Sequence, residues 1–164
     1  RGCKLALVTL LPTTWAQTSL LDLSSSSANF VSSFTLPSSW ARSGFPGWSR
    51  NLEPLPAGSN FTTSPSTGPT SAHYGSYYYF VDASSLAVPG DMSILSYACP
   101  SGALPSGATQ ALLTFRYNMY EATMGTLRVK DTSSSVIWTK TGDQGSSWWS
   151  ASVVVPTAGF SIEG

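Results

Sequence analysis

Residues 111–120 alternate between large apolar and polar side chains, and this alternation constrains the fold more than any other feature of the sequence. Four large apolar side chains fall on every second position, namely Leu113, Phe115, Tyr117 and Met119. A period of two residues is typical of a β-strand that buries one face, whereas a helix would repeat every three or four residues. We therefore expect a strand here, with these four side chains in the core.

Similar short runs recur along the chain, each bounded by Gly, Pro, Asn or Ser, and no segment shows helical periodicity. The runs cover residues 77–81, 92–95, 124–130, 136–138, 148–155 and 160–162. We expect residues 111–138 to form a β-meander, and residues 48–77, rich in Pro, Ser and Thr, to form an ordered irregular loop. The sequence thus predicts an all-β protein, a two-sheet jelly-roll-like β-sandwich.

The charge of the chain is low and balanced. Only 10% of the 164 residues are charged, with eight basic and eight acidic side chains, against about 25% in an average soluble protein. The length suits one domain. Since the basic residues do not cluster, nothing would attract nucleic acid or anionic lipid, and we expect no nucleic-acid partner.

The first eleven residues, RGCKLALVTLL, combine a basic tip with an apolar run. Three interpretations are open: a secretory signal, a membrane anchor or a β-strand. An anchor is disfavoured because the run stops at Pro12, well short of the roughly 20 apolar residues that a membrane span needs. A signal fits better, since Ala16 could stand near a cleavage site. The missing initiator Met suggests a matured protein or a fragment.

Two features suggest an extracellular protein. Cys3 and Cys99 permit one disulfide without requiring it. Asn60 opens an Asn-Phe-Thr sequon inside the segment rich in Pro, Ser and Thr, as in a surface loop of a secreted glycoprotein. We therefore predict a secreted, extracellular protein that carries covalent glycans, with Asn60 as a glycosylation candidate.

Catalytic groups are scarce. His73 is the only histidine, and Asp82 and Asp143 fall in turns where Asp commonly bonds its own backbone. No set of His, Cys, Asp and Glu has metal-ligand spacing. We expect no enzyme, no cofactor and no metal site. A binding module is the alternative, because aromatic side chains can stack on sugars; the candidates are Tyr77, Tyr78, Tyr79, Trp148 and Trp149.

Several motifs occur in an order known from one family. They are GWSR at 47–50, TGPTSAH at 67–73, YFVDASS at 79–85, FRYNMYEATMGTL at 115–127, GDQGSSW at 142–148 and FSIEG at 160–164. Together they resemble the MAM domain, an extracellular β-sandwich module of meprins, neuropilins and receptor-type tyrosine phosphatases. The family pattern has Gly after Met-Tyr, where this chain has Glu121.

The departures from that family are informative. MAM domains usually carry four cysteines, and Leu112 replaces one of them here; Ala72 stands where Asp is common. The family's disulfides and cation site are therefore not expected. Family members also continue past Glu-Gly into a final strand that this chain lacks, and the run from Leu5 to Leu10 resembles that strand.

The resemblance thus implies a displaced strand. We expect residues 1–28 to form a donor-type extended strand and linker, and residues 29–164 to form the MAM-like sandwich. The donor strand candidates are Leu5, Leu7, Val8, Leu10 and Leu11.

If this strand enters a neighbouring sandwich, copies of the protein would join head to tail as a structural or adhesive fibre. If it folds back, the protein is a closed monomer; a tandem array is a third possibility. The alternative function is a carbohydrate- or protein-binding adhesion module.

Overall fold

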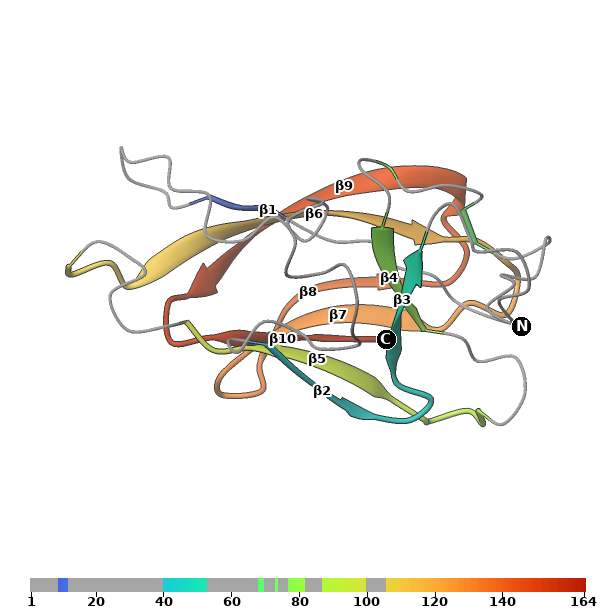
Figure 1. The fold of residues 1–164 in the computed structure, drawn as a ribbon, viewed down its shortest axis with the longest axis horizontal. Coiled ribbons are helices and arrows are strands. Elements are labelled where there is room, and N and C mark those ends of the chain that lie inside the picture. Colours follow the sequence, from blue (N-terminus) through green and yellow to red (C-terminus); the bar gives the residue numbers. More distant parts are fainter. Residues whose placement is uncertain are drawn as a thin grey trace.

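The computed structural model describes residues 9–11, 40–52, 68–69, 73, 77–81, 87–99 and 106–164, and Figure 1 shows their arrangement. These residues form ten β-strands and no helix. Within this part of the chain there is accordingly no helix long and apolar enough to cross a membrane. The boundary predicted between residues 28 and 29 lies outside the described residues.

The strands follow one another along the chain in ten segments. They are β1 Thr9–Leu11, β2 Trp40–Gly44, β3 Trp48–Leu52, β4 Tyr77–Val81, β5 Ser93–Tyr97, β6 Gln110–Met119, β7 Thr126–Asp131, β8 Val136–Thr141, β9 Gly145–Pro156 and β10 Phe160–Glu163. The all-β prediction is confirmed.

The strands build a β-sandwich with two main layers (Figure 1). One layer has five strands in the order β2-β5-β10-β7-β8, and the other has three in the order β1-β6-β9. Each neighbouring pair in both layers is antiparallel. The order is far from sequential, because β10 lies between β5 and β7.

The core lies between the two layers and follows the alternation of the strands. All four apolar side chains predicted for the inner face of β6 are buried: Leu113, Phe115, Tyr117 and Met119. The facing layer contributes Leu95, Leu127, Val129 and Ile162, each at most 1% exposed. Burial of such side chains stabilises a fold by about 1.5–3 kcal/mol each, so these strand faces hold the two layers together.

Aromatic rings close the sides of the core. Trp138 of β8 contacts Phe115 and Tyr117 of β6 edge to face, with ring centroids 5.1 and 5.3 Å apart. On the other side, Trp40 of β2 packs on Tyr97 and on Phe160 of β10, at 4.9 and 5.8 Å. A strand at each margin of the five-stranded sheet therefore contributes a tryptophan that packs in the core.

Strands β3 and β4 form a separate two-stranded ribbon that runs across the direction of the other strands (Figure 1). The predicted loop over residues 48–77 is therefore wrong at its start, since Trp48–Leu52 is a strand paired with β4. Tyr79 and Val81 face the main core, whereas Tyr78 and Phe80 pack against Trp148 in a second cluster. The ribbon thus has apolar contacts on both faces.

The expected meander over residues 111–138 is also wrong. β6 pairs with β9 and β1, and only β7 and β8 form a hairpin in the other layer. The chain changes layer after Met119, in a turn where Glu121 has φ of 131° and its carbonyl accepts a hydrogen bond from the Met124 amide. Met124 is buried and fastens this crossing to the core.

Gly44 has a close contact that no other residue type would fit. Its φ is +83°, and a Cβ there would lie on the Met92 carbonyl oxygen. Gly107 has the same φ of +83°, but nothing lies within 4 Å of its Cβ position. An alanine at Gly107 would therefore suffer backbone strain alone, whereas an alanine at Gly44 would also clash with the Met92 carbonyl.

We predict that Gly107→Ala lowers the free energy of unfolding by about 1 kcal/mol, the cost of a left-handed conformation. Gly44→Ala should cost a further ~1–3 kcal/mol, because the β2–β3 turn must move away from Met92. Urea denaturation followed by tryptophan fluorescence measures both changes. Equal losses in the two variants would contradict this account of Gly44.

Candidate functional site

Strand β1 lies at the edge of the three-stranded sheet, and among the described strands it pairs with β6 alone. The partners are Thr9 with Thr114, Leu10 with Leu113 and Leu11 with Leu112, in antiparallel register. The N-terminal segment is thus extended where the structure describes it, and it completes a sheet edge through backbone pairing. This edge of β6 is the candidate functional site.

The donor strand candidates are only partly described. Leu10 and Leu11 lie in β1, whereas Leu5, Leu7 and Val8 lie outside the described residues. In the structure, β1 pairs with β6 of the same chain. If β1 paired with β6 of a neighbouring subunit, the same residues would face each other. Leu10 and Leu11 therefore lie in a strand at this edge, and the donor role of the five candidates stays a prediction.

Strand β6 is held on its other edge by β9, through a register that begins at Gln110 with Pro156. The register shifts between Tyr117 and Met119, where a bulge in β9 faces Asn118. The Asn118 side chain donates hydrogen bonds to the carbonyls of Ser146 and Ser147, at 2.8 and 3.1 Å. A bulge leaves backbone groups without ladder partners, and this amide satisfies two of them.

The sequence pattern placed Asn118 on the outer face, yet it is fully buried. Its neighbour across the bulge, Trp148, is half-buried and packs edge to face on Tyr78 at 5.8 Å. Trp148 packs against Tyr78 and Phe80 of the β3–β4 ribbon in a cluster outside the main core, which we call the ribbon cluster. The bulge therefore gives a buried position to a residue that alternation alone predicts to be exposed.

The end of β10 lies beside the start of β5. The Ser93 amide donates to the Gly164 carbonyl at 2.8 Å, and the Gly164 amide donates to the Ser93 carbonyl at 3.0 Å. A Cβ at Gly164 would lie 3.3 Å from the Trp48 ring. Gly164 is thus paired in the middle of the five-stranded sheet.

A groove of about 810 Å³ opens beside Gly164, and we call it the acidic groove. Its walls come from the loop before β5, from the β6–β7 turn and from the ends of β7 and β10. The apolar part of the lining is Pro46, Val81, Ala87, Val88, Pro89, Met92 and Met124. Val88 is 62% exposed and Met92 38% exposed, so much apolar surface of the groove faces solvent.

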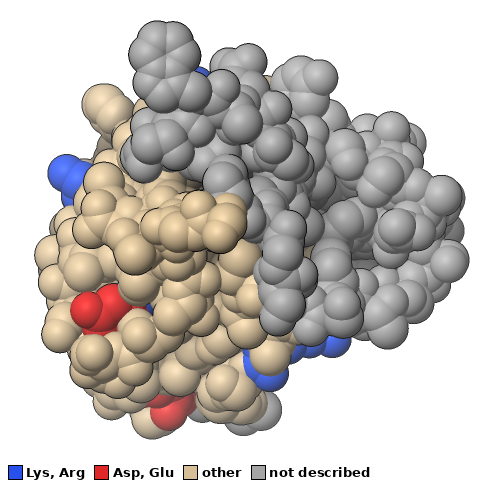
Figure 2. Space-filling view, turned by 90° about the vertical axis from the view of Figure 1, so that its left-hand side faces the viewer, with Lys and Arg blue, Asp and Glu red and all other residues tan. Residues whose placement is uncertain are grey.

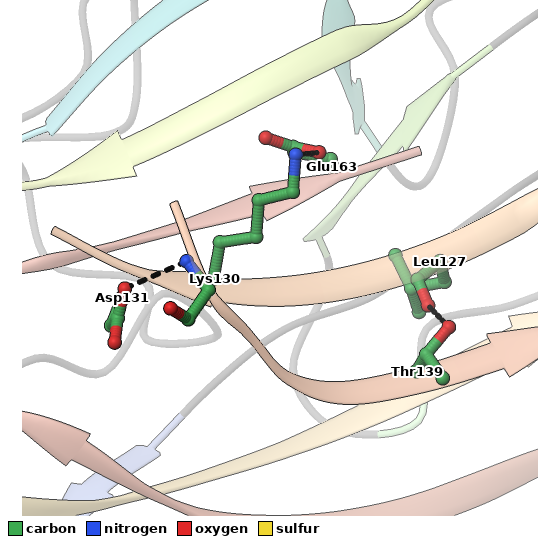
Figure 3. Close-up of polar contacts among 6 residues, drawn as sticks. Leu127, Lys130, Asp131, Thr139 and Glu163 are labelled. Atoms are coloured by element: carbon green, nitrogen blue, oxygen red, sulfur yellow. Dashed lines mark hydrogen bonds and ion pairs between the residues drawn. The ribbon is translucent and has the colours of Figure 1, made fainter. Parts of the chain in front are cut away.

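Among the described residues, four charged side chains line the acidic groove. They are the carboxylates of Asp91, Glu121 and Glu163 and the guanidinium of Arg128. Glu163 is 6% exposed and its carboxylate lies 2.7 Å from the Lys130 ammonium on the adjacent strand β7 (Figure 3). Asp91 accepts a hydrogen bond from the Val88 amide at 2.8 Å. Neither Asp91 nor Glu121 belongs to an ion pair in the described part of the chain.

This groove was not predicted from the sequence, because its lining comes from five segments that are separate in the sequence. One signal was available: Glu121 replaces the Gly of the resembled motif. A φ of 131° is a conformation that glycine favours, and a larger residue there costs on the order of 1–3 kcal/mol. A carboxylate thus occupies a strained position at the rim of the groove.

The residues considered for catalysis do not converge. The His73 ring packs edge to face on Trp148 at 6.4 Å. Asp143 accepts hydrogen bonds from the amides of Gly145 and Glu121, at 2.8 and 3.3 Å, so the turn role predicted for it is confirmed. Asp82 lies outside the described residues. Within the described ranges, no three His, Cys, Asp or Glu side chains are grouped to hold a metal.

The remaining sequence candidates divide in the same way. Cys99 is half-buried and packs against the core just after β5. Cys3 and Asn60 lie outside the described residues, so the disulfide and the glycan stay predictions. No model of a known protein family matches this chain, and the MAM resemblance therefore remains a prediction from the motifs.

Tyr97 gives the fold a dependence on alkaline pH. Burial raises the pKa of Tyr97 from 10.0 to about 12, and the neighbouring Cys99 thiol adds to the rise. Because the folded state holds the phenol proton more tightly, this contribution to stability is complete below pH 10. It is lost as the pH rises from about 10 towards 12.

We therefore expect the urea midpoint of the protein to fall between pH 9 and pH 11.5, and to fall less steeply in Tyr97→Phe. Tyr117, whose pKa burial also raises, accounts for part of the remaining fall. Tyr120→Phe is the control at a surface position. Parallel pH dependences in Tyr97→Phe and the parent protein would contradict this assignment.

The Lys130–Glu163 pair supports a second prediction. Lys130→Met keeps the length of the side chain but leaves the Glu163 carboxylate buried without its cation, at an expected cost of about 2–3 kcal/mol. Lys140→Met on the exposed strand β8 is the matched control and should stay within ~0.5 kcal/mol of the parent. Chemical denaturation at pH 7 measures both; equal effects would mean that the pair contributes nothing specific.

Proposed function

We propose that this protein is a secreted structural or adhesive subunit that assembles with copies of itself by exchanging its N-terminal strand. In the assembly, β1 of one subunit pairs with β6 of the next, and each subunit donates one strand and accepts one. The observation that carries the proposal is the position of β1 at a sheet edge, where β6 is its one neighbour among the described strands.

Strand exchange is a low-cost route to association, because the contact between subunits repeats a contact already present within one chain. The connector predicted at residues 12–28 can span on the order of 50 Å when extended. That reach is enough to place β1 on a neighbouring subunit. Donation to the next subunit need not close on itself, so it propagates as a filament.

The surface is compatible with close association between copies. Figure 2 shows one end of the sandwich, and its described part carries only scattered Lys, Arg, Asp and Glu side chains. The chain has no net charge at pH 7. Repulsion between identical subunits is therefore weak, which favours self-association over a dispersed monomer.

Sugar binding has less support. Tyr78 and Tyr79 are buried and Trp148 packs in the ribbon cluster, so these rings offer no stacking faces. Trp149 is 49% exposed, and its indole N–H donates to the Gln144 carbonyl at 2.8 Å. Among the candidate rings whose side chains the structure describes, Trp149 alone is exposed, and one ring is a small platform for a carbohydrate. Strand exchange remains the better-supported function.

We predict that Thr9→Pro abolishes assembly. Alternation along β6 directs the backbone groups of Thr114 towards β1, and proline at Thr9 removes the amide hydrogen of that pair and fixes φ. Ser24→Pro, within the predicted connector, is the control and should assemble normally. Light scattering after size exclusion and negative-stain microscopy measure the result.

Deletion of residues 1–11 should have the same effect as Thr9→Pro and leave subunits that bind a synthetic peptide of residues 1–11. A parent protein that is a monodisperse monomer, and that stays equally stable without residues 1–11, would disprove strand exchange.

A further inference from the structure

We propose that the acidic groove receives the basic tip of the strand that pairs with β6, residues 1–4, so that the groove and the β6 edge form one continuous acceptor site. The inference rests on the proposed function, since in the assembly the tip belongs to the neighbouring subunit. It adds a second contact and a defined partner for the groove: the N-terminal tip of a second copy of this chain.

The register of β1 on β6 supports this placement. Thr9 pairs with Thr114 and Leu11 with Leu112, so the chain before Thr9 is directed towards Met119. Continued in the same register to the end of β6, the donated strand would bring Lys4 opposite Met119, and residues 1–3 would lie beside the β6–β7 turn that carries Glu121. Glu121 lines the acidic groove, and the register therefore leads from the ladder into it.

The β6 edge between Phe115 and Met119 can accept this continuation. Among the described strands, β6 has two neighbours: β9 runs along one edge, and β1 covers only Leu112 to Thr114 on the other. A strand edge is a template for an added strand, because its amides and carbonyls recur at the spacing of a ladder. The remaining half of this edge suits the residues that precede Thr9.

The composition of the tip matches the groove. Residues 1–4 carry two basic side chains, Arg1 and Lys4. In the groove, Lys130 neutralises Glu163, which leaves the carboxylates of Asp91 and Glu121 against a single lining cation, Arg128. The local balance is therefore negative, and two positive side chains reverse it. Such complementarity fixes orientation and register as well as adding affinity.

The apolar lining matches the residues that follow the tip. Val88, Met92 and Met124 line the groove, and Ala6 lies on the same face of an extended strand as Lys4. Covering exposed Val88 and Met92 removes apolar surface from water, which is favourable. The donated segment thus offers charge to the rim of the groove and apolar side chains to its lining.

This placement has a consequence for the cysteines. Cys3 would lie beside the turn that leaves β6, whereas Cys99 follows β5 at the opposite end of the sandwich, near Phe160. Two cysteines at opposite ends of a domain are far beyond the separation that a disulfide allows, about 7 Å between Cα atoms. The native cysteines should therefore remain unlinked to each other in the assembly.

Cross-linking tests the position of the tip. In a Cys99→Ser background, Thr123→Cys at the groove should react with Cys3 of the next subunit under mild oxidation. The product is a ladder on a non-reducing gel. Thr132→Cys, in the β7–β8 turn at the other end of the sandwich, is the matched control and should give no ladder. The reverse pattern would overturn the inference.

Charge reversal tests the chemistry. Glu121→Lys should weaken assembly roughly five- to tenfold, as expected for a partly exposed ion pair that becomes repulsive. Lys4→Glu combined with it should restore assembly. Glu121→Gly separates binding from folding: it relieves the strain at φ 131°, so subunit stability should rise while assembly still weakens.

The outcomes distinguish this inference from the proposed function. If deletion of residues 1–11 abolishes assembly but the Glu121 variants assemble like the parent, strand exchange stands and the groove contact is wrong. If the deletion has no effect on assembly, the proposed function itself fails. If Glu121→Lys abolishes assembly and the added Lys4→Glu substitution does not restore it, the groove contact is also wrong.

Discussion

The ladder between β6 and β9 is the interaction on which the rest of the structure depends. It joins the long strand β6 to a second long strand along nearly its whole length, and this support holds the inner face of β6 against the five-stranded sheet. The opposite edge of β6 is left for β1. The bulge at Asn118 keeps the ladder continuous where β9 carries extra residues, because one buried amide satisfies two displaced carbonyls. The core and the candidate acceptor edge are thus two sides of the same strand.

The acceptor site proposed here would give the assembly a direction. A backbone ladder alone recognises any strand of suitable length, because its hydrogen bonds do not depend on side chains. The acidic groove at one end of that ladder distinguishes a basic tip from the rest of a segment. A donor that entered with its register shifted would leave the carboxylates of Asp91 and Glu121 without the added cations of the tip. The specificity of the assembly would then come from the charges of the groove and the tip, in a chain in which only 10% of the residues are charged.

The sequence predicted the strands that have a regular alternation and failed where position depends on distant partners. β6 and β10 were located to within a residue or two, since their buried side chains repeat every second position. β2 was missed because only Trp40 of its five residues is buried. The meander prediction failed because proximity in sequence favours pairing between neighbours, whereas the turn at Glu121 carries the chain into the other layer. The groove depends on loops from distant segments, and no local pattern encodes it.

The place of β10 has a consequence for how the protein is made. β10 pairs with β5 on one side and β7 on the other, although it is the last of the described strands to leave the ribosome. Until Phe160 to Glu163 have been synthesised, the sheet consists of two separate halves with open inner edges. Contacts between distant segments form slowly, so the nascent chain exposes aggregation-prone edges until β10 arrives. Production of this protein should therefore be sensitive to the rate of translation between β7 and β10 and to chaperones that cover unpaired strands.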